Sequence, residues 1–125
     1  FFKIKVDFPT EDELITILDR TTGSAHHEPR PVMDGDRLRE LQSFIRNVMP
    51  VTPSLTRYVV RVLRATHPDG EHATDLVNRY VRFGGSPRGA QSLLTAAKIR
   101  AALSGRESVS HDDVRAVAPS AYGTG

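Results

Sequence analysis

The sequence predicts a mostly α-helical fold, a bundle of short amphipathic helices preceded by one β-strand. Apolar residues recur at intervals of three and four through most of the chain, which is the spacing of a helix that buries one face. Residues that favour helix N-termini stand ahead of several of these stretches. Residues 1–8 instead alternate strictly between apolar and polar, which is the period of a strand.

The composition is that of one globular domain. The chain has 125 residues, of which 38% are hydrophobic and 26% charged, and no apolar run approaches the roughly 20 residues of a membrane span. The absence of cysteine excludes disulfides, thiolate metal sites and cysteine nucleophiles, and agrees with a cytoplasmic location. The net charge of +2 is too small to favour nucleic acid as a partner, and no membrane partner is expected.

The first eight residues are expected to form a strand with one buried face, made by Phe2, Ile4, Val6 and Phe8. Nothing later in the chain has the pattern of a partner strand, and a lone strand cannot satisfy its backbone hydrogen bonds. We therefore expect residues 1–8 to be the last strand of an α/β core that precedes this chain. A helical domain over residues 9–118 and a flexible tail over residues 119–125 would follow.

Capping signals place the helices of the first half. Thr10 and Glu13 form the capping box of a helix over about residues 11–20, whose buried side is expected to hold Leu14, Ile17 and Leu18. A loop rich in glycine and proline follows. Apolar spacing then predicts a second helix that ends before Pro50, and a Thr-Pro pair opens a third.

The third helix carries a basic stripe of Arg57, Arg61 and Arg64 opposite its apolar side. Such a stripe is usually a solvated face. The alternative is that the chain is a small basic helical module that binds nucleic acid or a protein partner through these arginines. Steeply salt-dependent binding to duplex DNA would favour that alternative.

The helices of the second half are a short one around residues 74–80, a long central one and a last one. Ser86 as N-cap and Pro87 as first helical residue start the central helix, which is apolar over much of its circumference. Ser110 and Asp113 form a second capping box ahead of the last helix.

Arg88 falls in the first turn of the central helix, where the free N–H groups already carry partial positive charge. An acidic residue would be preferred there by roughly 0.3 to 1 kcal/mol. A bound anion would relieve this conflict, because helix N-termini and guanidinium groups both bind phosphate oxygens. The alternative is that Arg88 belongs to a solvated polar stripe with Gln91 or Ser92, Thr95 and Lys98.

Motifs for catalysis are absent from the sequence. There is no Gly-x-x-x-x-Gly-Lys-Ser/Thr loop to cradle a triphosphate, and no Gly-x-Ser-x-Gly elbow to present a nucleophile. The histidines at residues 26–27 and at His67 and His72 lie in expected loops, without carboxylates that would fix a metal geometry. We expect no catalytic residue and no metal ligand in this chain.

Three stretches carry a resemblance to a known family: the opening Phe1-Phe2-Lys3-Ile4 with Phe8-Pro9, the stretch Gly84-Gly85-Ser86-Pro87-Arg88-Gly89-Ala90, and Asp112-Asp113-Val114 in the last helix. In this order they resemble the C-terminal end of a MoxR-type AAA+ ATPase, in which the second stretch reads Gly-Ala-Ser-Pro-Arg-Ala. The resemblance covers nearly the whole chain. Its specific parts are the Ser-Pro-Arg helix start and the terminal Asp-Asp-Val helix.

The resemblance implies a helical lid domain that packs over nucleotide bound to the α/β core. Arg88 would be the second sensor arginine, which reaches the terminal phosphate, with Gly85, Ser86 and Pro87 forming the turn around it. The parent protein would be the ATPase, with ATP and magnesium bound to it and not to this chain alone. The implied partners are the upstream core, neighbouring subunits of a ring, often a hexamer, and a protein with a von Willebrand factor A domain, in a chaperone-like role.

The chain departs from the family pattern at two positions, Gly85 and Gly89, where the family has alanine. Glycine is the most flexible residue in the backbone. We therefore expect the turn to be loosened and Arg88 to be held less firmly.

Overall fold

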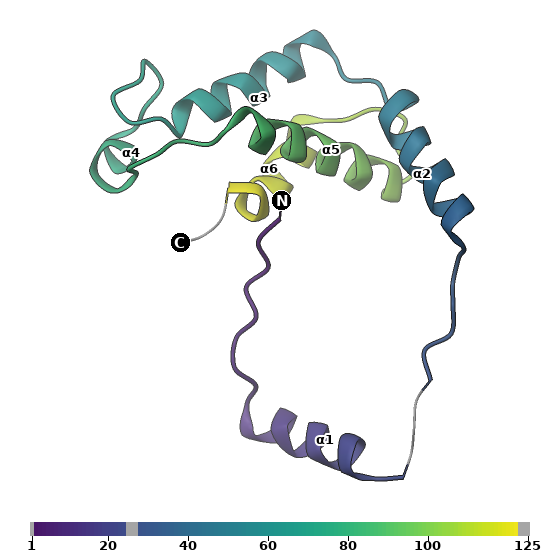
Figure 1. Ribbon diagram of the computed structural model, residues 1–125. Helices are drawn as coiled ribbons and strands as arrows, with labels where there is room; N and C mark the ends of the chain where they lie inside the picture. Colours follow the sequence, from purple (N-terminus) through teal and green to yellow (C-terminus); the bar gives the residue numbers. More distant parts are fainter. Residues whose placement is uncertain (1, 25–27, 123–125) are drawn as a thin grey trace.

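The structure, a computed structural model, describes residues 2–24 and 28–122, which form six helices. Figure 1 shows how these helices are arranged. The helices are α1 (Glu11–Thr22), α2 (Gly35–Asn47), α3 (Pro53–Ala65), α4 (Asp75–Tyr80), α5 (Pro87–Leu103) and α6 (His111–Tyr122). The described residues contain no strand. The prediction of a mostly α-helical fold is confirmed.

Helix α5 lies at the centre of the bundle and packs against α2, α3 and α6. Its residues Leu93, Ala97 and Ala101 are fully buried and follow one another at intervals of four, so they form one stripe of the helix. Two of the three are alanines, which allow the neighbouring helices to approach closely. Leu55 of α3 and Val114 of α6 belong to the same core and are also fully buried.

The start of α6 is fastened by Asp113, a charged residue that is only 1% exposed. Its carboxylate accepts two hydrogen bonds from the Arg106 guanidinium, and a third, of 2.9 Å, from the backbone N–H of Ser110. The Ser110 hydroxyl accepts from the Asp113 N–H at 3.3 Å, which completes the predicted capping box. The hydrogen bonds from Arg106 lower the pKa of Asp113 far below its ordinary value, against the opposing effect of burial.

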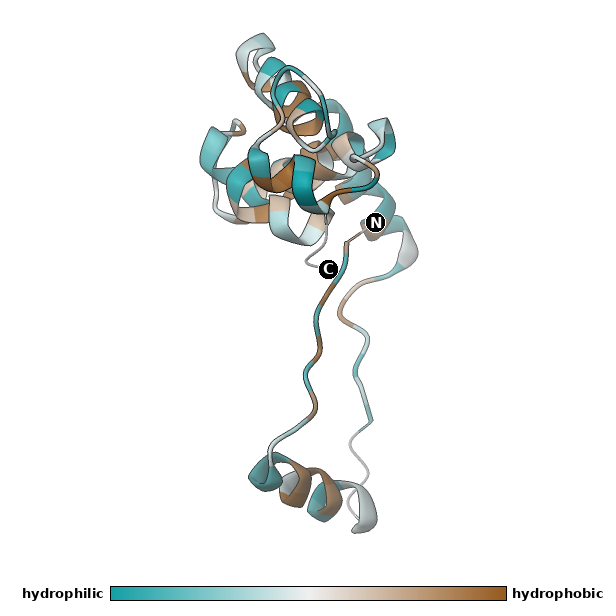
Figure 2. Cartoon of the chain, turned by 90° about the vertical axis from the view of Figure 1, so that its left-hand side faces the viewer, coloured by the Kyte–Doolittle hydropathy of each residue, from teal (hydrophilic) through white to brown (hydrophobic). Residues whose placement is uncertain are grey.

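Helix α1 stands apart from the bundle, as Figures 1 and 2 show from two sides. It begins at the predicted capping box, in which Glu13 accepts the Thr10 N–H at 2.8 Å. Its expected buried side is not buried, because Ile17 is 44% exposed and Leu18 is 58% exposed. The amphipathic pattern predicted the helix correctly, but the surface that would cover its apolar side is not among the described residues.

The strand predicted over residues 1–8 is not formed by its described part. Residues 2–10 run as an extended segment without a ladder, and the side chains of Ile4, Val6 and Phe8 are 83% to 86% exposed. The reason is physical, because a strand exists only by pairing with another. One backbone hydrogen bond ties the segment to the bundle, from the Lys3 N–H to the Ser120 carbonyl at 2.8 Å.

Helix α6 continues past Pro119, where we expected the tail to begin, and reaches Tyr122. Proline inside a helix removes one backbone hydrogen bond and crowds the preceding turn. The turn beyond it is nevertheless helical, and its residues Ala121 and Tyr122 pack against the core. The rest of the expected tail, residues 123–125, lies outside the described residues.

Candidate functional site

The predicted start of α5 is present in the structure. Ser86 has the extended backbone of an N-cap, and its hydroxyl accepts the Gly89 N–H at 3.2 Å. Pro87 is the first helical residue, so Arg88 lies in the first turn, with its side chain exposed. The local sequence signals were therefore sufficient to place Arg88.

The Arg88 side chain has no hydrogen bond or ion pair with any of the residues that the structure describes. The first turn of α5, like that of α3, contains no acidic side chain, whereas α1, α2, α4 and α6 each have at least one there. The Arg88 guanidinium and the partial positive charge of the α5 N-terminus thus lie together at an exposed position. The turn contains no acidic side chain that would neutralise them. This combination is suited to binding an anion with several oxygens.

The turn before Arg88 is held by the end of α3. The Gly85 N–H donates to the Thr66 hydroxyl at 2.7 Å, and the Gly85 carbonyl lies 2.9 Å from Nε2 of His67. The Thr66 hydroxyl in turn donates to the Leu63 carbonyl at 2.6 Å. The N–H and the carbonyl of Gly85 are therefore both hydrogen-bonded, and the expectation of a loosened turn is wrong at this residue.

Gly84 is needed for a different reason, a close approach of the His67 ring. A Cβ atom at Gly84 would lie 2.4 to 2.6 Å from three atoms of that ring, which no side chain tolerates. Sequence reasoning missed both Thr66 and His67. They lie 19 and 18 residues before Gly85, respectively, in a segment without periodic signals, so nothing local indicated the contact.

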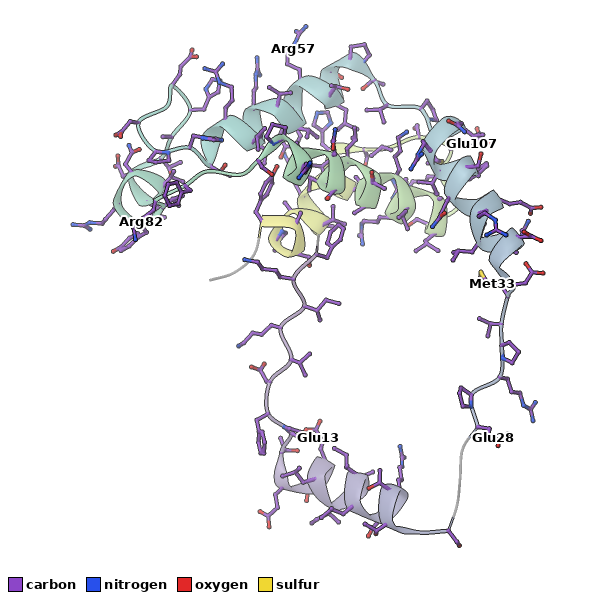
Figure 3. The ribbon with its side chains drawn as sticks, in the orientation of Figure 1. Glu13, Glu28, Met33, Arg57, Arg82 and Glu107 are labelled. Carbon is purple, nitrogen blue, oxygen red and sulfur yellow. The ribbon has the colours of Figure 1, made fainter. Side chains whose placement is uncertain are left out.

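The basic stripe of α3 is not brought to this site. Arg57 and Arg61 are exposed, and Arg64 forms an exposed ion pair with Glu71 at 3.4 Å. Figure 3 shows Arg57 pointing away from the bundle. Lys98, on the polar stripe that also begins with Arg88, donates instead to the Arg46 carbonyl at 3.1 Å. Ten residues of helix, about 15 Å, separate Lys98 from Arg88.

An apolar groove of about 850 Å³ lies between α2 and α5, and its lining includes Leu41, Phe44, Leu94 and Ile99. It takes its α5 residues from Gln91 onward, so Arg88 is outside it. The start of α5 around Arg88 and this apolar groove are therefore separate features of the molecule.

Within residues 2–24 and 28–122, no group of three or more histidine, aspartate or glutamate side chains is placed to hold a metal ion. None of the helices in this part of the chain is long and apolar enough to cross a membrane. His26 and His27, which the sequence analysis considered as metal ligands, lie outside the described residues.

Comparison with known proteins agrees with the arrangement around α5. Residues 73–123, which include α4, α5 and α6, match the AAA lid domain family. The chain is 35% identical to Chaperone MoxR1 of Mycobacterium tuberculosis over 94% of its own length and 31% of the relative. It is also 35% identical to Protein MoxR of Methylorubrum extorquens, over 70% of this chain and 27% of the relative.

The fold itself is found in a crystal structure of a proposed ATPase from Cytophaga hutchinsonii. That structure matches 97% of this chain with a TM-score of 0.81, at 21% sequence identity, and the match covers 37% of the solved chain. The chain thus spans about a third of the length of the relatives that it matches. The family match and the two MoxR relatives agree, and the chain carries a helical AAA lid domain that is similar to part of the MoxR proteins.

Proposed function

We propose that the chain is the lid of an ATP-binding and ATP-hydrolysing AAA+ protein of the MoxR type, and that Arg88 is the second sensor arginine of its nucleotide site. The observation that carries the proposal is the exposed Arg88 guanidinium, which has no partner among the described residues and lies in a first turn without acidic residues. The proposed ligand of Arg88 is the terminal phosphate of ATP. Gly85, Ser86 and Pro87 form the turn that presents Arg88 to it.

The chemistry follows from the guanidinium. A planar fork of N–H donors binds two phosphate oxygens at once and stays charged at any physiological pH. In phosphoryl transfer such a group stabilises the charge that spreads over the terminal phosphate oxygens. This chain has no phosphate-binding loop, so the α/β core of the complete protein would hold ATP and its magnesium ion.

A contact of this kind links the nucleotide to the position of the lid. Arg88 gains a partner when the terminal phosphate is present and loses it after hydrolysis, so ATP favours a closed lid more than ADP does. Since the relative in Mycobacterium tuberculosis is named a chaperone, we propose a chaperone-like role in the cytoplasm, where ATP is available. The proposed partners are the subunits of a ring, such as a hexamer, and a von Willebrand factor A domain protein.

The test is Arg88→Ala in the complete protein. Losing one charge-assisted contact of roughly 1.5 to 3 kcal/mol should lower ATP turnover about tenfold to a hundredfold. The affinity for ATP should fall more than the affinity for ADP. Arg88→Lys should rescue only partly, because a point charge replaces a two-pronged donor.

Arg57→Ala is the matched control, since Arg57 is an exposed helical arginine that points away from the bundle. It should leave turnover and nucleotide preference unchanged. Equal turnover and an equal ATP-to-ADP affinity ratio in Arg88→Ala and the unsubstituted protein would refute the assignment.

A further inference from the structure

Tyr122, at the end of α6, lies against the turn that presents Arg88. An ideal Cβ atom at Gly85 would lie 2.6 Å from Cε1 and 3.1 Å from Cδ1 of the Tyr122 ring. A Cβ atom at Gly89 would lie 3.2 Å from the same Cε1. The ring therefore occupies the space that side chains at these two positions would need.

The two glycines that Tyr122 contacts are the two positions at which this chain departs from the Gly-Ala-Ser-Pro-Arg-Ala pattern. Neither has the left-handed backbone that would demand glycine, since Gly105 is the glycine with positive φ in the described chain. A side chain at either position would meet the Tyr122 ring, and one at Gly85 would also meet Leu63, whose Cδ1 would lie 3.0 Å from a Gly85 Cβ. These contacts explain why both positions are glycine.

We propose that Tyr122 is a positioning residue for the nucleotide site, whose ring fixes the start of α5 and thereby the reach of Arg88. The inference rests on the proposed role of Arg88. Thr66 and His67 hold the two peptide groups of Gly85, and the Tyr122 ring closes the space beside it. Gly85 is three residues from Arg88, and Pro87 between them has a fixed φ, so a shift at Gly85 is passed on to Arg88.

The ring carries this role, and the hydroxyl does not. The Tyr122 oxygen is buried without a hydrogen-bond partner among the described residues, and burial raises the pKa of the hydroxyl. Removing an unpaired buried hydroxyl does not weaken packing. Tyr122→Phe should therefore behave like the unsubstituted chain or better, whereas Tyr122→Ala removes the surface on which the turn rests.

The packing is tested first in this chain by a double-mutant cycle of Gly85→Ala and Tyr122→Ala. Gly85→Ala alone should lower Tm by at least about 5 °C, because the new Cβ meets the ring. In the Tyr122→Ala background the same substitution should cost far less, since the ring is gone. Gly35→Ala is the control, because a Cβ there would meet only the flexible end of Arg39 at 3.7 Å. Additive effects of the two substitutions would overturn the packing argument.

The functional test measures ATP and ADP affinities in the complete protein. Tyr122→Ala should reduce the preference for ATP over ADP about as much as Arg88→Ala does, the double variant should show little further loss, and Tyr122→Phe should keep the preference. If Tyr122→Ala proves unstable, Gly85→Ala disturbs the same contact while keeping the ring.

The outcomes separate the two proposals. If Arg88→Ala changes the preference and both Tyr122→Ala and Gly85→Ala leave it intact, Tyr122 has a structural role alone and the positioning inference fails. If Arg88→Ala itself leaves the preference intact, the proposed function fails. A variant that is merely less stable loses total activity without changing the ratio of the two affinities, so the ratio is the decisive readout.

Discussion

Arg88 and Asp113 both lie in the first turn of a helix, and their surroundings are opposite. Asp113 is buried, negative at the positive end of α6, and bonded by Arg106 and Ser110. Arg88 is exposed, positive at the positive end of α5, and without a partner among the described residues. The first arrangement stabilises the bundle by itself, whereas the second is suited to binding an anion.

Asp113→Asn should lower the free energy of unfolding of this chain by about 2 to 4 kcal/mol at pH 7, because the Arg106 guanidinium loses its charged partner. Asp112→Asn is the neighbouring control. The Asp112 side chain is 88% exposed and, among the residues that the structure describes, is paired only with Arg115, so its loss should cost less than about 1 kcal/mol. Urea unfolding of both variants measures the difference, and equal losses would contradict the structural role of Asp113.

The same residue predicts a pH dependence. The pKa of Asp113 is lowered in the folded chain, so its stabilisation is fully present above the unfolded value of about 3.9 and is lost as pH falls below it. The unsubstituted chain should therefore lose stability below about pH 4 more steeply than Asp113→Asn. Parallel stability curves for the two chains over this range would be inconsistent with a lowered pKa.

At the scale of the elements, the sequence predicted the features that depend on residues close together in the chain, such as the helix starts. The capping residues Thr10, Ser86 and Ser110 placed the starts of three helices, because a cap bonds to amides within three residues. The contacts of Gly85 with His67 and Tyr122 were not predicted, since they join segments far apart in the sequence. The exposure of α1 was missed for a related reason, because an amphipathic pattern shows that a face is apolar without showing what covers it.

Helix α1 should be far less stable than α5 in this chain. It has 12 residues, no buried side chain and β-branched residues whose hydroxyls bond back to the helix, as Thr16 and Thr21 do at 2.9 and 2.7 Å. Amide hydrogen exchange should show α1 protected roughly tenfold or less, against a protection of Leu93 and Ala97 that reflects global unfolding. Protection of α1 equal to that of α5 would mean that a surface covers it in solution.

At the scale of the molecule, the chain combines a packed bundle with an apolar surface that none of the described residues covers. Figure 2 shows the segment of residues 2–10 and α1 extending from the bundle, with apolar residues along both. A surface of this kind in a protein normally meets a partner. The proposed α/β core would supply that partner, since residues 2–8 have the pattern of a strand and α1 follows them directly.

The bundle alone should bind nucleotide very weakly and should not hydrolyse it. Of the parts that hold a triphosphate, this chain supplies one arginine at a helix start and no phosphate-binding loop. One charge-assisted contact contributes roughly 1.5 to 3 kcal/mol, and a Kd of 1 mM requires about 4.1 kcal/mol, so the Kd for ATP should exceed about 1 mM.

NMR titration with ATP should shift the amide signals of residues 86–90 by small amounts, and Arg88→Ala should abolish these shifts while Arg57→Ala keeps them. A Kd below about 0.1 mM, or turnover by the purified chain, would show that the chain holds phosphate by groups other than Arg88 and the start of α5.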